Sequence, residues 1–408
     1  MEKAVIDKER EEFKEVHWVL KNANSKQFYE FSLEMEEFPN ITILKIENLE
    51  ETGLIFENNT LSGIAAAHNM YDLDIAFFHT RDVHTIAVKK VQLFINADPK
   101  DLWKNIPSDR EADFYKPDET SYKGKFLDKR IVVASKRGRS HAHEGKFRDD
   151  DFAVNELPGE WSIVSVSDGA GSAAAAREGS RLAAVSVNTF FSTPDILKEI
   201  EKNISILYRS EHAELMEHEA GQNIIRCLYE SVLYVYHTLD KTASELGLSI
   251  SDLHTTLIFT LAKKFDFGYI ILSFGVGDCP IILINEDFSE VRLLNLMDVG
   301  EFGGGTRFIT MKEIFNDQII SRFGITLVND FSHLILMTDG IYDPKFVTEN
   351  KLEDLASWKT FFNDLNGNND DRSKVDFIND TEIDTRLLTW ADFWSRGNHD
   401  DRTLAIIY

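Results

Sequence analysis

The chain has 408 residues, which exceeds the size at which one hydrophobic core usually stops growing and favours two or three domains. Apolar residues make up 43% of it and charged residues 28%, which is typical of a globular protein and excludes a disordered or fibrous one. The net charge of −25 argues against broad binding to nucleic acids or anionic membranes, because both need a basic surface.

The cysteine count and the N-terminus bear on the compartment. Cys227 and Cys279 are too few for a disulfide framework. The first residues, MEKAVIDKEREEFKE, are charged where a signal peptide would be apolar, and no stretch has the length of a membrane span. These features predict a soluble cytoplasmic protein with no nucleic-acid partner and no membrane partner.

The first domain is expected over residues 1–96, as a small α/β or mostly-β accessory domain of unknown role. Its histidines are scattered without the spacing of metal ligands, and it carries no catalytic motif. Alternation and β-branched content predict strands, and Asn and Thr near the start of one segment predict a short helix. The strands are expected at 31–36, 41–47, 73–80 and 84–95, and the helix at 58–70.

A polar stretch follows that contains Pro99, Pro107 and Pro117. Proline-rich polar segments between apolar blocks are typical of linkers. We therefore predict a linker over 97–128 and a second domain over 129–408.

The second domain alternates apolar strands with long helical patterns, which predicts an α+β fold of sheets covered by helices. No internal repeat is visible. The strands are expected at 131–135, 161–168, 255–264, 268–278, 280–285, 332–339 and 402–408, and the helices at 172–191, within 209–246 and at 386–397.

Aspartates recur at the ends of these apolar segments. One Asp-Gly pair usually marks a turn, but several acids at apolar strand ends are costly to bury without a cation. Carboxylate oxygens are the ligands that Mg²⁺ and Mn²⁺ prefer. The acidic segments are RDDD (148–151), VSDGAG (166–171), GVGD (275–278), LMTDGIYD (336–343) and NHDD (398–401).

These segments, in this order over about 130–408, resemble the signatures of metal-dependent serine/threonine protein phosphatases, the PPM or type 2C family. GRSHAHEGKFRDDDF (138–152) is similar to the opening motif of a bacterial subgroup, which has G-x-S-H followed by a Gln-Asp pair. The resemblance implies a β-sandwich of two mixed or antiparallel sheets flanked by helices, with metals at one edge.

The resemblance also implies a site for two or three Mn²⁺ or Mg²⁺ ions. Asp168 and Asp339 are its central catalytic acids, together with His141. The implied metal ligands are Asp168, the Gly169 carbonyl, Asp339 and Asp400 around the first ion, Asp150 with Asp149 beside it near the second, and Asp278 and Asp343 at a third.

A phosphate group needs a cationic partner. His141, Lys146 and Arg148 are the candidates, and His141 is preferred because it matches the histidine of the bacterial motif. The alternative is that these basic residues only balance the neighbouring acids. GEFGGGTRF (300–308) is expected to be a flap near the site, and Thr255–Thr256 are expected to pack behind the metals.

Three positions depart from the family pattern. Many members have His where this chain has Ala170, and the Asp149–Asp151 run leaves the register of the opening acids open by one residue. Asp401 stands where the family often has Asn. None of the departures removes a central carboxylate.

The leading hypothesis is a hydrolase that removes phosphate from phosphoserine and phosphothreonine in proteins, with a metal-activated water at a di-metal centre. Its partners would be a phosphorylated protein substrate and, at the N-terminal domain, a cognate kinase or regulatory protein. Two alternatives remain: a phosphatase-like protein that binds phosphoproteins with little turnover, and a metal phosphohydrolase of small molecules.

Overall fold

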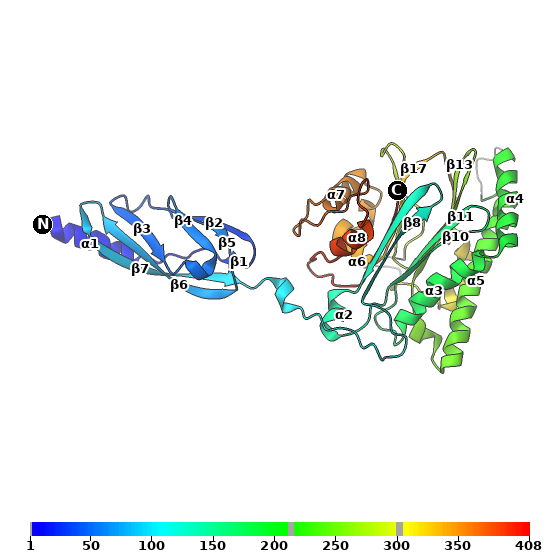
Figure 1. The fold of residues 1–408 in the computed structure, drawn as a ribbon, viewed down its shortest axis with the longest axis horizontal. Helices are drawn as coiled ribbons and strands as arrows, with labels where there is room; N and C mark the ends of the chain where they lie inside the picture. The colour runs from blue at the N-terminus through cyan, green and yellow to red at the C-terminus, as the bar shows by residue number, and fades with distance from the viewer. Residues whose placement is uncertain (1, 211–215, 299–304) are drawn as a thin grey trace. The chain divides into compact units, whose positions relative to one another are not determined.

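The computed structural model describes residues 2–210, 216–298 and 305–408. The chain divides into two compact units, Met1–Trp103 and Lys104–Tyr408. Both units combine helices with largely antiparallel sheets (Figure 1), which confirms the α+β class. None of the helices in the described ranges has the length and apolarity needed to span a lipid bilayer.

The described residues of the first unit form one α-helix and two sheets. One sheet has the order β1-β7-β6-β3 and the other has the order β2-β5-β4. The elements are α1 (Glu2–Glu15), β1 (Ala23–Asn24), β2 (Phe28–Ser32), β3 (Ile41–Glu47), β4 (Leu54–Glu57), β5 (Thr60–Ile64), β6 (Asn69–His79) and β7 (Asp82–Asn96).

Helix α1, which the sequence did not predict, packs against the rest of this unit through a narrow stripe of buried side chains, which are Ile6, Arg10 and Phe13. The ring of Phe13 lies 4.6 Å from that of Phe77. Lys89 of β7 donates to the carbonyls of Phe13 (2.7 Å) and Lys14 (3.1 Å), and so satisfies groups that a helix end leaves unpaired. The helix is hard to recognise from the sequence because its buried stripe is small and most of its residues are charged.

The helix predicted at 58–70 is wrong. Residues Thr60–Ile64 form β5, which pairs with β2 and β4, and Asn69 begins β6. Asn58 and Asn59 both have positive φ, as the central residues of a tight hairpin turn do. The two asparagines are therefore a turn signal rather than a helix start. The strands predicted at 41–47, 73–80 and 84–95 lie in β3, β6 and β7.

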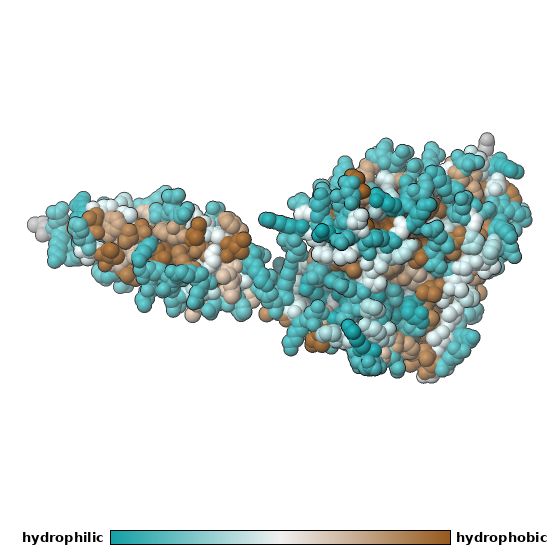
Figure 2. Space-filling model, viewed as in Figure 1, coloured by the Kyte–Doolittle hydropathy of each residue, from teal (hydrophilic) through white to brown (hydrophobic). Residues whose placement is uncertain are grey.

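The long β6–β7 hairpin leaves apolar side chains exposed. Met70 pairs with Phe94 and Phe78 with Ile86 across the two strands. Met70, Phe94 and Ile86 are about half exposed. Apolar side chains gather on the visible face of this unit (Figure 2).

The second unit is a sandwich of two antiparallel sheets, as the family resemblance implied. Their orders are β10-β11-β12-β13-β16 and β15-β14-β17-β18-β9-β8. The strands are β8 (Glu119–Phe126), β9 (Lys129–Lys136), β10 (Asp151–Leu157), β11 (Trp161–Ser167), β12 (Leu257–Phe265), β13 (Gly268–Val276), β14 (Ile281–Asn285), β15 (Val291–Leu293), β16 (Phe323–Val328), β17 (Phe331–Met337) and β18 (Arg402–Ile407).

Helices cover the outer face of each sheet (Figure 1). One core lies between the sheets and includes Val133, Val164 and Leu336. The helices are α2 (Arg139–Glu144), α3 (Ala176–Phe191), α4 (Pro194–Ser210) and α5 (Glu219–Leu246), with α6 (Asp339–Phe346), α7 (Leu355–Leu365) and α8 (Ile383–Ala391) in the C-terminal part. Helix α4 was not predicted, whereas α3 and α5 lie in segments predicted to be helical and α8 overlaps the first half of the helix predicted at 386–397.

The structure differs from the linker predicted over 97–128. The boundary between the two units falls between Trp103 and Lys104 in the sequence. Residues Glu119–Phe126 form β8, an edge strand that pairs along its whole length with β9. The three prolines stand before this strand, so they do not disturb its pairing. The second half of the predicted linker therefore belongs to the sandwich.

A partly buried histidine in β17, His333, is expected to make the stability of the second unit pH-dependent. His333 lies among Phe288, Phe362 and Phe377, and its Nδ1 has no hydrogen-bond partner among the described residues. Burial, together with the charge of Lys129, lowers its pKa to about 4. The native state therefore holds a neutral imidazole that the unfolded chain protonates below about pH 6.5.

We expect His333→Phe to protect this unit against acid. Because the folded pKa is depressed, wild type loses stability as the pH falls from about 6.5 towards 4, and the variant lacks this loss. The difference in unfolding free energy should grow by about 2 kcal/mol between pH 7.5 and pH 5. Urea unfolding at both pH values measures it, with His237→Phe on the exposed face of α5 as the control. Parallel losses in wild type and His333→Phe would contradict the prediction.

Candidate metal centre

Five of the predicted aspartates come together where strands of the two sheets begin or end. Asp168 directly follows β11, and Asp150 directly precedes β10. Asp339 begins α6 two residues after β17. Burial raises the pKa of Asp168 well above its usual value, and the nearby acids raise it further. Those acids are, in decreasing order, Asp339, Asp150, Asp400 and Asp278.

Asp150 is the most buried aspartate of this acidic cluster, with an exposed fraction of only 1%. Its Oδ2 accepts hydrogen bonds from the hydroxyls of Thr338 (2.8 Å) and Thr403 (2.7 Å). Burial and the charge of Asp401 raise its pKa to about 8. Of the opening acids, Asp150 lies among the acids around Asp168, while Asp151 pairs with Lys116.

Two carboxylate oxygens of the cluster indicate that it can bind a cation. The Oδ1 atoms of Asp150 and Asp339 are buried and have no hydrogen-bond partner among the described residues. Burial, followed by the charge of Asp400, raises the pKa of Asp339 well above its usual value. An acidic cluster of this kind is unstable alone and is relieved by a divalent cation. The donor set is rich in carboxylate oxygen, which fits Mn²⁺ or Mg²⁺.

The turn after Asp168 fits closely against its neighbours. A Cβ at Gly169 would lie 2.6 Å from the Asp149 carbonyl oxygen, so only glycine fits there. The hydroxyl of Thr255 donates to the Asp168 carbonyl (2.8 Å), and the Asp168 N–H donates to the hydroxyl of Thr256 (2.9 Å). The two threonines therefore fix the backbone behind Asp168.

His141, on α2, lies beside the cluster and is held by Asp401. Its Nδ1 is 3.1 Å from Asp401 Oδ2, and its Nε2 is 3.8 Å from Asp149 Oδ2. Burial alone would lower the pKa of His141, but the hydrogen bond to Asp401 and the charges of Asp401, Asp149 and Asp400 raise it to about 9. Burial also raises the pKa of Asp149, to about 6, against the opposing charge of His141.

Asp401 has a supporting role that the sequence did not reveal. Its carboxylate is 2% exposed and accepts from the backbone N–H of Gly138 (2.5 Å) as well as from that of Asp149. Burial would raise its pKa, but the hydrogen bond with His141 and these backbone donors bring the pKa below its usual value. The charged carboxylate of Asp401 thus holds Gly138, His141 and Asp149 together by hydrogen bonds.

Asp278 and Asp343, which the family resemblance assigned to a third ion, lie on one side of the cluster. Burial raises the pKa of Asp343, and the charge of Asp278 raises it further. Asp278 Oδ2 accepts from the hydroxyl of Thr306 (2.7 Å). In the expected flap over 300–308, residues 300–304 lie outside the described residues.

The structure turns one of the predicted phosphate contacts, Arg148, away from the acids. Arg148 is 2% exposed, and its guanidinium donates to the carbonyls of Asp150 (2.8 Å) and Pro117 (3.3 Å). The Arg148 side chain points into the unit, so its N–H groups bond to backbone carbonyls behind the cluster and do not face a substrate. Lys146 is exposed and pairs with Glu144 (2.6 Å). His141 lies beside Asp149 and Asp401, and Lys146 stays a prediction from the sequence.

Two buried cations support the site from segments without any motif. Lys116 contacts the backbone beside Asp150. Arg322 makes two hydrogen bonds to Asp298 (2.9 and 2.7 Å), and Asp298 accepts from the Gly277 N–H (2.8 Å) next to Asp278. Spacing could not have identified these contacts, since they join parts of the chain that are far apart in sequence.

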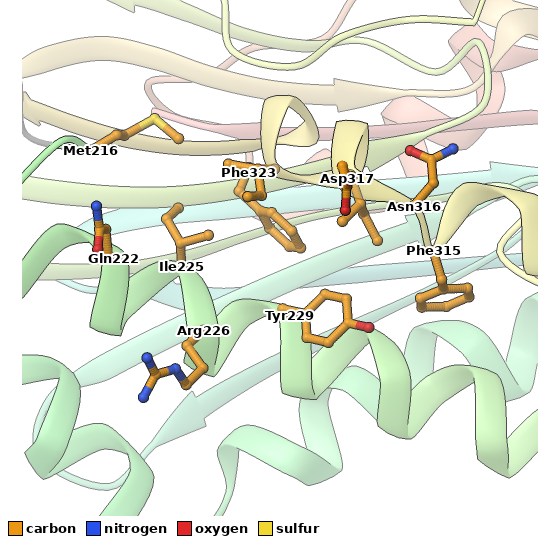
Figure 3. Close-up of a pocket in the computed structure, with 11 residues that line it drawn as sticks. Met216, Gln222, Ile225, Arg226, Tyr229, Phe315, Asn316, Asp317 and Phe323 are labelled. Atoms are coloured by element: carbon orange, nitrogen blue, oxygen red, sulfur yellow. The ribbon is translucent and has the colours of Figure 1, made fainter. Parts of the chain in front are cut away.

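A cavity of about 510 Å³ lies elsewhere in the same unit (Figure 3). Its walls come from α5, including Ile225 and Tyr229, and from residues 315–323, including Phe315 and Phe323. None of the predicted site residues lines it. The acidic cluster and this cavity are therefore separate features.

Comparison with known proteins gives one family match and several similar folds. The model of the family "Protein phosphatase 2C" matches residues 137–383. Serine/threonine phosphatase Stp1 from Staphylococcus aureus is 14% identical, with a TM-score of 0.42, 70% of this chain covered and 95% of that one. The serine/threonine phosphatase of S. agalactiae is 14% identical, with a TM-score of 0.42 and coverages of 70% and 99%.

The catalytic domain of the serine/threonine protein phosphatase PstP, solved in complex with 2 manganese ions, is a further similar structure. It is 15% identical, with a TM-score of 0.38 and coverages of 71% of this chain and 98% of that one. No curated protein matches the chain.

Proposed function

The chain belongs to the protein phosphatase 2C family of protein serine/threonine phosphatases, since the family model covers more than half of it. We propose that it removes phosphate from phosphoserine and phosphothreonine in proteins at a di-metal centre. The observation that carries this proposal is the acidic cluster around Asp168, in which Asp150 is buried, Asp339 is partly buried, and each has a buried carboxylate oxygen without a partner among the described residues.

The ligand assignment follows the positions of the side chains. Bound Mn²⁺ or Mg²⁺ would supply a Lewis acid and a water of lowered pKa for attack on phosphorus. Asp168 and Asp339 stand at the centre of the cluster, which supports their catalytic assignment. The residues proposed to hold two ions are Asp168, the Gly169 carbonyl, Asp339, Asp400 and Asp150 with Asp149 beside it, and those proposed for a third are Asp278 and Asp343.

His141 is proposed to contact the phosphate and to donate a proton from Nε2 to the departing serine or threonine oxygen. Position 170 holds Ala, so this chain lacks the histidine that many family members have there. Asp401 accepts the hydrogen bond of Nδ1, which leaves Nε2 as the ring nitrogen available to a substrate. The hydrogen bond between His141 and Asp401 supports His141 as the residue that protonates the leaving oxygen in place of a histidine at position 170.

Hydrolysis of a phosphothreonine peptide by the full-length protein tests the function. We expect phosphate release with Mn²⁺, none with excess EDTA, and recovery when Mn²⁺ is added back. A panel of nucleotides and sugar phosphates, assayed beside phosphopeptides, should be turned over more slowly, because we propose a protein substrate. A folded protein that binds Mn²⁺ without releasing phosphate would instead favour the phosphoprotein-binding alternative, with Ala170 as its first explanation.

A partner at the first unit is a further part of the proposal. The exposed apolar side chains of β6 and β7, such as Met70 and Phe94, support contact with a kinase or regulatory protein. A cytoplasmic location stays a prediction from the sequence.

A further inference from the structure

A buried lysine lies directly behind the acidic cluster. Lys116 stands shortly before β8, outside the residues that match the family model, and it is 6% exposed. Its Nζ lies 2.7 Å from the Asp150 carbonyl oxygen and 3.1 Å from Asp151 Oδ2. An enclosed ammonium group is costly unless its N–H groups are paired, so these contacts must offset a large desolvation penalty.

The same ammonium reaches the first turns of α3. It lies 3.2 Å from the Arg177 carbonyl oxygen and 3.2 Å from the Ser180 hydroxyl, and 3.5 Å from the Asp149 carbonyl oxygen. Ser180 in turn donates to that Asp149 carbonyl. Lys116 therefore ties the residues that precede β10 to the helix that follows the Asp168 turn.

The segment that carries Lys116 is itself anchored to α3. The guanidinium of Arg177 donates to the carbonyls of Asp113 (2.8 Å) and Phe114 (3.2 Å). Arg177 holds this segment through its side chain, and its own carbonyl receives Lys116. The two contacts together fix where the ammonium lies.

The two segments joined by Lys116 carry proposed metal ligands. Asp150 lies on one, and Gly169 precedes the other and packs against the Asp149 carbonyl oxygen. Arg148 donates to the Asp150 carbonyl from the other side (2.8 Å). The peptide behind the Asp150 carboxylate is thus held by two cations, while its front presents an oxygen without a partner among the described residues.

We propose that Lys116 is a positioning residue of the metal centre. Its ammonium holds the Asp149–Asp151 backbone against α3, and this keeps the Asp150 carboxylate where it can bind a cation. Its positive charge also reduces the repulsion among the acids before an ion binds. The inference rests on the proposed function for the identity of the ions, and it deepens that function by adding a residue outside the part of the chain that matches the family model.

Mn²⁺ binding by calorimetry to the metal-free full-length protein tests the proposal, with Lys116→Met compared with Lys263→Met. Lys263 is a matched control because it is also mostly buried in this unit, where it pairs with Glu201 (2.6 Å). We expect both variants to unfold at a lower temperature. Only Lys116→Met should bind Mn²⁺ about tenfold more weakly, as losses of supporting contacts at metal sites typically do, and excess Mn²⁺ should restore most of its kcat.

Two results would overturn the proposal: wild-type Mn²⁺ affinity in Lys116→Met, or an equal loss of affinity in Lys263→Met. If Lys116→Met does not fold, Ser180→Ala decides, because its hydroxyl links Lys116 to the Asp149 carbonyl. It should weaken Mn²⁺ binding about threefold, the effect of one hydrogen bond, and unchanged affinity would overturn the proposal. Calorimetry needs no turnover, so a wild type that binds Mn²⁺ but releases no phosphate would refute the proposed function and leave this test intact.

Discussion

We expect Asp168→Asn to hydrolyse a phosphothreonine peptide at least about a thousandfold more slowly than wild type, and yet to be more stable than wild type without metal. Asp168 lies at the centre of the cluster, where burial and four neighbouring acids disfavour its charge. The asparagine keeps the size of the side chain and removes that charge. The metal-free unfolding free energy should rise by about 1–2 kcal/mol at pH 7, while Mn²⁺ should stabilise the variant less than wild type.

Phosphate release and thermal unfolding, each with Mn²⁺ and with EDTA, measure the two halves of this expectation. Asp195→Asn is the matched control, because it makes the same charge change on a side chain that is 88% exposed. It should leave both quantities unchanged. Turnover within tenfold of wild type, or a metal-free Asp168→Asn protein that unfolds at a lower temperature, would contradict the role given to Asp168.

Asp401→Asn should cost both activity and stability, although the family often has asparagine at this position. The carboxylate accepts from Gly138 on Oδ1, and from Asp149 and His141 on Oδ2. An asparagine has one acceptor oxygen, so its NH₂ group must face a donor in either orientation. We expect a loss of about 3 kcal/mol in unfolding free energy and about a hundredfold in kcat, because His141 loses its charged partner.

Urea unfolding and steady-state kinetics at saturating Mn²⁺ measure these losses. Asp392→Asn serves as the control, since Asp392 is 56% exposed and pairs with Arg139, also on α2. A surface ion pair of this kind contributes little. If Asp401→Asn matched wild type in stability and kcat, the carboxylate would not be the support described here.

Much of the second unit could be predicted from its sequence. The apolar runs that became β9, β11, β12 and β13 are buried on both faces, and such runs are visible in a sequence because neither face needs polar residues. Acids at strand ends, such as those before β10 and after β11 and β17, could be grouped because a shared sheet edge brings distant residues together, and the family resemblance selected the ligands among them. Asp150, Asp168 and Asp339 were found in this way.

The errors arose where contacts across the chain decide the structure. Asn58 and Asn59 resemble a helix start until β4 and β5 are seen to pair around them. Arg148 resembles a phosphate ligand because it adjoins the acids, but its side chain turns inward to the Asp150 carbonyl. Lys116 carries no signal at all, since its partners lie on residues 149–151 and on α3.

The position of β18 has a consequence for synthesis of the protein. This strand lies between β17 and β9, and Leu404 pairs with Ala134 from the far end of the unit. At about 5–20 residues per second, a ribosome needs roughly 10–50 s to travel from one partner to the other. Throughout that interval β9 lacks its central neighbour, and Asp400 has not been made. A nascent chain therefore cannot assemble the complete acidic cluster, and we expect activity to begin only after translation has passed β18.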